Sequence, residues 1–274
     1  MNLGLVAIQR AFHLSAPLLR GAWSAVRGWK ALKPSKSRIP ITRYRLECMV
    51  VVALARGWAE EGWMRRRWIG CALGWWLGFV CLLRPGEILN LRCQDVSLPE
   101  GQGVEIEELG AVVVIRQPKT RRVWKEQFVT CKDLALVRWL SWWMADLKPF
   151  DLLFGVSRYV LARHFSRALA LLGLDEVQYT LGSLRAGGCT DHFQTFRNLG
   201  ELQFLGRWKQ ASTLQFYLHE AYAVHVTRQG SERCRQLLRE THGHVHMLEK
   251  SPVSAHWSIG SEYGLCLTYR ASST

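Results

Sequence analysis

The sequence has few features that would indicate a metal-binding, redox or membrane-spanning protein. Its eight cysteines are scattered, with no C-x-x-C pair, so neither a zinc site nor a dithiol redox motif is indicated. Buried thiols in a reducing compartment are expected instead. The apolar run Trp68 to Leu83 carries no charge, but it is shorter than the roughly 20 residues that cross a bilayer. This run predicts a buried core helix and not a membrane segment.

Acidic residues are also scarce. The chain of 274 residues has a formal net charge of +14, and no acid precedes Glu47. Such a surplus favours a polyanionic partner, with nucleic acid ahead of an anionic membrane. The first 46 residues contain nine Lys or Arg, which is typical both of a basic arm on phosphates and of an organelle transit peptide. Both alternatives stay open.

The order of sequence patterns predicts a mainly α fold of the α+β class, in which a small sheet interrupts two sets of helices. Apolar residues recur at helical spacing over 43–65 and 66–83, and a short helix follows from Pro85 to Arg92. Short β-branched runs at 104–106, 111–116 and 123–129 predict a three-stranded antiparallel sheet. Helical spacing returns at 133–147 and 157–172, and in several pieces from 183 to 248; the tail after Leu248 has no clear period.

Proline and basic residues from Lys33 to Pro40 indicate a linker. We therefore expect a basic arm or a remnant of a DNA-clamping domain at 1–43, a main domain at 44–250 and a tail at 251–274. A chain of this length, 49% hydrophobic, is long enough to bury a substantial core.

Several motifs along the chain occur in a fixed order. They are Leu83-Arg84-Pro85-Gly86-Glu87, the segment Thr180 to Gly188 that contains Arg185, then Gly206-Arg207-Trp208, and last Tyr217. The intervals are 101 residues from Arg84 to Arg185, 23 from Arg185 to Trp208 and 9 from Trp208 to Tyr217. In order and spacing this set resembles the catalytic pattern of the tyrosine recombinase or phage integrase family, over about residues 44 to 224. The sequence from Ser183 to Gly188, together with Gly206-Arg207-Trp208, is most similar to the recombinases of eukaryotic mobile elements, DIRS-like retrotransposons among them.

The resemblance implies DNA strand breakage and rejoining through a covalent phosphotyrosine, without a metal or other cofactor. Tyr217, expected in a helix from Ser212 to Ala221, would be the nucleophile, and Tyr222 is a rival of lower rank. Arg84 and Arg185 would neutralise the charge on the phosphate, since guanidinium groups bind it bidentately and keep their proton.

The other positions that match the family pattern have supporting roles. Lys119, in the hairpin, would be the general acid; Trp208 would donate to the phosphate or pack the nucleophile; Glu87 would fix a helix start. Basic neighbours of these residues are expected to contact DNA: Arg116, Arg121, Arg122, Arg207 and Lys209.

One position departs from the pattern. Gly182 stands three residues before Arg185, where the family usually places a histidine, and it has no side chain for proton transfer. Ser183 would be only a partial substitute because a hydroxyl is a poor acid. A backbone with a positive φ at this position would be another reason for a glycine. The departure leaves a catalytically degenerate DNA-binding relic as the alternative function.

The remaining expectations concern partners and rival functions. Double-stranded DNA is the expected partner, with a homo-tetramer on DNA and a nuclear location implied by the resemblance. Type IB topoisomerase chemistry is a subsidiary alternative, and a basic organelle protein of unrelated function is the third class. His242, His244 and His246 alternate in a way that can suggest metal binding, but on a helix they would face different directions, so no metal is expected.

Overall fold

The computed structural model describes residues 2–32, 38–99, 110–116, 126–218, 220–228, 230–250, 252, 256–260 and 266–270. The chain divides into two compact units, Met1–Ser37 and Arg38–Thr274. The first unit contains α1 (Asn2–Ala11), the 3-10 helix η1 (Ala16–Leu19) and α2 (Arg20–Leu32). The proposed site lies entirely within the second unit.

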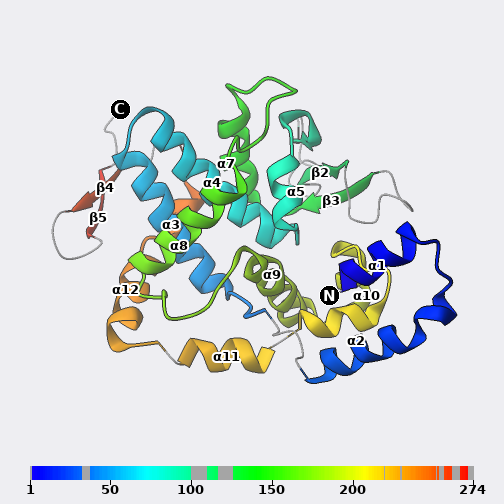
Figure 1. Ribbon diagram of the computed structural model, residues 1–274. Coiled ribbons are helices and arrows are strands. Elements are labelled where there is room, and N and C mark those ends of the chain that lie inside the picture. Colours follow the sequence, from blue (N-terminus) through cyan, green and yellow to red (C-terminus); the bar gives the residue numbers. More distant parts are fainter. Residues whose placement is uncertain are drawn as a thin grey trace. The chain divides into compact units, whose positions relative to one another are not determined.

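The second unit is mainly α with a small sheet, as the sequence predicts (Figure 1). Its elements up to the middle of the chain are α3 (Arg43–Ala59), α4 (Gly62–Val80), α5 (Pro85–Asn90), η2 (Cys93–Asp95), β1 (Val96–Ser97), β2 (Ala111–Ile115), β3 (Gln127–Cys131) and α7 (Leu134–Met144). There follow α8 (Arg158–Leu171), α9 (Leu181–Phe196), α10 (Leu199–Leu205), η3 (Ala211–Phe216), α11 (Glu220–Arg228), α12 (Glu232–His242), η4 (Val245–Glu249), β4 (His256–Gly260) and β5 (Cys266–Arg270).

The inserted sheet is antiparallel in the order β1-β2-β3, with Val96 opposite Val113 and Val113 opposite Val129. Alternate residues of β2 are buried, as expected for a sheet with one face on a core. The strand predicted at 104–106 lies outside the described residues, and the first strand found is β1. The sequence also missed the hairpin of β4 and β5, which lies at the opposite side of the second unit from the sheet (Figure 1).

The core is built on α3 and α4, which pack against each other. The uncharged run predicted to form a core helix lies mainly in α4, where the side chains from Trp68 to Phe79 are buried. Within the described residues, no helix combines the length and apolarity that a membrane span requires. The expected helix over 43–65 ends earlier, at Ala59, and α4 begins at Gly62, whose φ of +54° favours glycine.

Several tryptophans of the core satisfy their indole N–H groups. Trp139 donates to the carbonyl of Leu248 at 2.9 Å, and Trp143 donates to the carbonyl of Leu153 at 2.7 Å. Both indoles are buried, and a buried indole usually finds such a partner. These two tryptophans therefore have a structural role.

The predicted buried thiols are also found. Cys48, Cys71, Cys81, Cys131, Cys189 and Cys234 are buried and unpaired, and Cys93 is half-buried. Burial raises the pKa of the Cys48 thiol to about 12. That thiol is thus protonated and unreactive at neutral pH.

Close packing of α9 on α4 explains the Ala-Gly-Gly sequence in the middle of α9. A Cβ atom at Gly188 would lie 2.1 Å from the carbonyl oxygen of Phe79, and one at Gly187 would lie 2.0 Å from that of Ile41. Both neighbours are backbone atoms that cannot rotate away. The two glycines allow α9 to approach α4 and the segment before α3. This close packing fixes the position of α9 and therefore of Arg185, which precedes the two glycines in the same helix.

Candidate active site

The site begins at the turn between α4 and α5, where Arg84 is the N-cap of α5 and Pro85 its first residue. The backbone N–H of Arg84 donates to Glu87 Oε2 at 2.8 Å, and its guanidinium donates to Glu87 Oε1 at 2.6 Å. One carboxylate thus caps the helix and holds the arginine side chain. The Arg84 side chain remains 29% exposed, so it is both fixed and accessible to a ligand.

Arg185 extends from α9 into the same region, and it is 1% exposed. Its guanidinium donates to the carbonyl oxygens of Leu82 at 2.6 Å and Gly206 at 2.5 Å. Its Nε atom is buried with no hydrogen-bond partner. Burial, together with the charges of Arg84 and Arg207, lowers the pKa of Arg185 to about 10, which still leaves it charged at neutral pH. Arg185 therefore links α9 to the turn that carries Arg84.

Arg207 is a third guanidinium of this cluster. Its backbone has a φ of +56°, and its side chain, 6% exposed, donates to Glu87 Oε2 at 3.1 Å and to the carbonyl oxygen of Leu82 at 3.1 Å. The sequence predicts that Arg207 contacts DNA. Its buried partners favour a supporting role, in which it holds Glu87 and the α4–α5 turn.

Glu87 is thus surrounded by Arg84 and Arg207, with Arg185 Nη1 at 3.9 Å. Burial would raise the pKa of Glu87, but the charge of Arg207 and the hydrogen bond and charge of Arg84 together lower it. We call Arg84, Arg185, Arg207 and Glu87 the arginine cluster. Three guanidiniums facing one carboxylate leave a net positive charge, which suits an anionic ligand.

Trp208 and Tyr217 pack against this cluster. The Arg185 guanidinium carbon lies 4.6 Å from the centre of the Trp208 ring and 5.7 Å from that of Tyr217. The two rings have centroids 5.0 Å apart. Trp208 is buried over Gly206, where a Cβ atom would overlap the indole. Residues 84, 185, 208 and 217, far apart in the sequence, therefore form one site.

The surroundings of Tyr217 differ from the prediction. The single helix expected from Ser212 to Ala221 is wrong, because the 3-10 helix η3 ends at Phe216, Tyr217 follows it and α11 begins only at Glu220. The Thr190 hydroxyl donates to the carbonyl oxygen of Tyr217 at 3.1 Å, which ties the tyrosine backbone to α9. The rival Tyr222 lies within α11 and is 39% exposed.

The remaining predicted site residues are the general acid and the basic residues expected to contact DNA, other than Arg207. Lys119, Arg121 and Arg122 lie outside the described residues. Arg116 follows β2 and pairs with Asp95 and with Glu126, while Lys209 is exposed beside Trp208. The role of all five in DNA contact or catalysis stays a prediction.

Ser183, considered as a partial substitute for the missing histidine, is buried and belongs to the N-terminal cap of α9. Its hydroxyl accepts a hydrogen bond from the backbone N–H of Thr180 at 3.0 Å. A hydroxyl used in this way stabilises the start of the helix. The structure therefore favours a capping role for Ser183.

The three alternating histidines have separate local partners. The His242 ring stacks on Tyr44 with centroids 4.2 Å apart, whereas His244 and His246 contact backbone carbonyls of Glu240 and Gly243. Among the described residues, no group of three metal-ligating side chains gathers. The histidine pattern is thus explained by local contacts.

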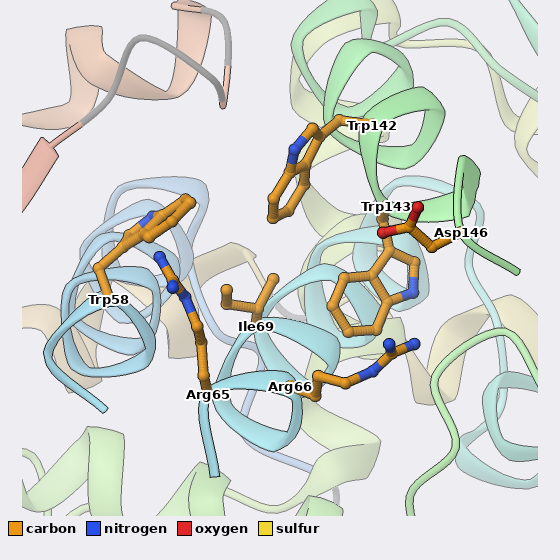
Figure 2. A pocket seen from close by; sticks show the side chains of 7 residues that line it. All are labelled: Trp58, Arg65, Arg66, Ile69, Trp142, Trp143 and Asp146. Atoms are coloured by element: carbon orange, nitrogen blue, oxygen red, sulfur yellow. The ribbon is translucent and has the colours of Figure 1, made fainter. Parts of the chain in front are cut away.

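A hollow of about 260 Å³ lies elsewhere in the second unit, between α3, α4 and α7 (Figure 2). The Arg65 guanidinium covers the Trp58 ring at 3.9 Å, and that of Arg66 lies 5.5 Å from the centre of the Trp143 ring. No member of the arginine cluster lines it. The Trp58 and Trp143 rings are thus already in contact with the protein's own cations, and we assign the hollow no ligand.

The arginine cluster makes a prediction about stability. Glu87→Gln is expected to lower the free energy of unfolding by about 3 kcal/mol at pH 7, because it leaves buried guanidiniums without their counter-charge. The folded-state pKa of Glu87 is lowered, so its contribution is present above the unfolded pKa of about 4.3 and is lost as pH falls through the folded value. Urea unfolding at pH 7 and at successively lower pH would measure the difference between the two proteins.

We expect the difference in the free energy of unfolding between wild type and Glu87→Gln to become smaller below about pH 4. Glu126→Gln is a matched control, since Glu126 is 44% exposed in its pair with Arg116 and such pairs contribute about 0–1 kcal/mol. A loss for Glu87→Gln that is no larger than the control, or that does not change with pH, would contradict the central role of this carboxylate.

Known structures show what kind of fold carries this site. No protein-family model matches the sequence, and a search of curated proteins returns no match. Among solved structures, the chain is similar to the XerH site-specific recombinase bound to a palindromic difH substrate in a post-cleavage complex, with a TM-score of 0.51 and 20% identity over 66% of this chain and 50% of that one. For a pre-cleavage complex of XerH with difH, the TM-score is 0.50 and the sequence identity is 19%, over 68% of this chain and 52% of that one.

The fold is therefore that of a tyrosine recombinase catalytic domain, as the sequence predicts. The chain spans about half the length of the XerH chains that it matches.

Proposed function

We propose that this protein breaks and rejoins DNA strands through a covalent 3′-phosphotyrosyl intermediate, as a recombinase or integrase. The observation that carries the proposal is the arginine cluster in contact with Trp208 and Tyr217. A positive, largely buried cluster beside a tyrosine is what phosphodiester cleavage without a metal requires. The fold similarity to a recombinase supports it.

In the proposed reaction the Tyr217 hydroxyl gives up its proton to water, and its oxygen attacks the phosphorus atom of a DNA strand. The bond from phosphorus to the 5′ oxygen breaks, the phosphorus becomes bonded to Tyr217, and the departing 5′ oxygen takes up a proton. Arg84 is fixed by Glu87 with part of its surface open, so it would stabilise the charge on the non-bridging oxygens. Lys119 is the proposed donor of the proton. Rejoining is the same step in reverse.

The proposed partner is double-stranded DNA, bound in the nucleus by a tetramer of this chain. We also propose that the sequence comes from a mobile-element recombinase of the DIRS-like type. The net charge of +14 supports a DNA partner. An adduct with a nicked duplex that survives denaturation would test the enzyme activity.

A second candidate is a DNA-binding relic that has lost cleavage, and Gly182 is the observation that favours it. The glycine cannot transfer a proton, and general acid or base catalysis is worth about 100-fold to 10,000-fold. Relaxation of supercoiled DNA without strand exchange would instead indicate type IB topoisomerase chemistry.

DNA binding is expected to depend steeply on salt, because each neutralised phosphate releases a counterion. If at least six phosphates are contacted, affinity for a mixed-sequence duplex should fall about 1,000-fold between 50 and 200 mM salt. Fluorescence anisotropy over that range measures it. An affinity that does not change with salt would rule out both DNA-binding candidates.

A further inference from the structure

The segment that precedes α3 lies along the first turns of α9. The Ile41 N–H donates to the carbonyl oxygen of Ser183 at 3.3 Å, and the missing side chain of Gly187 leaves room for the Ile41 carbonyl. The segment belongs to the second unit, which begins at Arg38. These contacts place Arg38 beside the start of α9.

The side chain of Arg38 occupies the space over Gly182. A Cβ atom at position 182 would lie 2.0 Å from Nη1 of Arg38 and 2.6 Å from its Cδ and Cζ atoms. Gly182 is not among the glycines with positive φ, which are Gly62, Gly110, Gly155 and Gly173. The explanation by a positive φ is therefore wrong. The glycine allows an arginine from another segment to approach the helix.

This position brings Arg38 close to the proposed reaction. Residues 182 and 185 are three apart in α9, so they share a face and differ by about 4.5 Å along the helix axis. The guanidinium of Arg38 thus lies over a residue that stands one turn before Arg185 in the sequence of α9. This is the N-terminal end of a 16-residue helix, a position that favours a bound anion. Among the described residues, none forms an ion pair or hydrogen bond with the Arg38 side chain.

Two buried guanidinium nitrogens of the arginine cluster, Nε of Arg185 and Nε of Arg207, have no hydrogen-bond partner among the described residues. Arg185 itself is 1% exposed. The arginine cluster has three guanidiniums and one carboxylate, and Arg38 adds a fourth positive charge on the same side of α9. Within the described part of the chain, Glu87 is the only carboxylate that forms an ion pair with any of these four guanidiniums.

We propose that Arg38 contacts the DNA phosphate undergoing cleavage, in the space that a side chain at position 182 would otherwise fill. This proposal rests on the proposed function. Arg38 supplies positive charge and N–H donors to a non-bridging oxygen. It transfers no proton, because a guanidinium keeps its own. The site is thus completed by a residue from outside the pattern of motifs, and the wild-type reaction proceeds without an imidazole.

The first experiment measures anion binding and needs no catalysis. Inorganic phosphate, titrated into the full chain, is expected to raise the midpoint of thermal unfolding because it binds the folded state. The rise should be smaller for Arg38→Ala than for wild type, and Arg38→Lys should recover part of it. Arg158→Ala is the matched control, since Arg158 is an exposed arginine of α8 and its loss removes the same charge. Equal rises in Arg38→Ala and Arg158→Ala, or no rise in any protein, would overturn the proposal.

The second experiment measures adduct formation on a nicked duplex at saturating protein. Arg38→Ala is expected to reduce the rate about 100-fold, as loss of one donor to a developing oxyanion does, while DNA affinity changes no more than in Arg158→Ala. The single Gly182→His variant is expected to displace Arg38, because the atoms nearest to a Cβ at position 182 are the movable end of that side chain. Gly182→His combined with Arg38→Ala should recover adduct and acquire a pH dependence with a midpoint near about 6.5, the ordinary pKa of histidine.

An unchanged rate of adduct formation in Arg38→Ala would overturn the proposed role of Arg38. Absence of adduct in every protein, wild type included, would overturn the proposed function, and the phosphate titration would then decide the role of Arg38 by itself.

Discussion

Tyr217→Phe is expected to abolish the covalent adduct with DNA completely. The substitution removes only the hydroxyl that would bond to phosphorus. The phenyl ring keeps its packing against Trp208, at 5.0 Å between centroids, and against Arg185. Stability and DNA affinity should therefore remain close to those of wild type. Denaturing electrophoresis of a labelled nicked duplex measures the adduct, and anisotropy measures binding.

Tyr222→Phe is the matched control for this prediction. Tyr222 lies five residues further along, in α11, and it should leave adduct formation unchanged. Persistence of the adduct in Tyr217→Phe, or its loss in Tyr222→Phe, would identify a different nucleophile.

Arg84→Ala is expected to slow adduct formation at saturating DNA by about 100-fold to 1,000-fold, as loss of one preorganised donor does. The residue is 29% exposed and held by Glu87, so its guanidinium is available to the phosphate. Because the charge it would stabilise develops mainly in the transition state, DNA affinity should fall far less than the rate. Single-turnover rates and binding isotherms separate the two effects.

Arg185→Ala provides a useful contrast. The Arg185 side chain holds the carbonyl oxygens of Leu82 and Gly206 in the interior, so its loss should also destabilise the protein, by about 1–3 kcal/mol for each group left unsatisfied. Arg84→Ala should unfold at nearly the same urea concentration as wild type. If Arg84→Ala weakens binding and cleavage equally, Arg84 is an ordinary phosphate contact.

Sequence patterns were sufficient to predict the order of helices and sheet because they depend on local periodicity. The uncharged run of α4 and the β-branched residues of β2 indicate their own structures. The tail hairpin was missed since the sequence after Leu248 shows no clear period. The helix expected around Tyr217 was wrong because helical spacing does not distinguish an α-helix from a short 3-10 helix.

The candidate site was predictable only where it followed the spacing of motifs. Arg84, Arg185, Trp208 and Tyr217 were selected in this way, and the structure brings them together. The buried position of Arg207 depends on a left-handed backbone and on Glu87, which no local pattern reveals. Arg38 is 144 residues from Gly182 in the sequence, so its approach to that glycine follows only from the tertiary fold.

The proposed nucleophile is tested most directly by identifying the residue that becomes bonded to DNA. Wild-type protein would be incubated with a nicked duplex and digested with protease and nuclease, and the products analysed by mass spectrometry. We expect a peptide containing Tyr217 that carries a nucleotide through its 3′ phosphate, together with a free 5′ hydroxyl on the released strand. A protein that binds the duplex but yields no modified peptide, or one that carries the nucleotide on another residue, would contradict it.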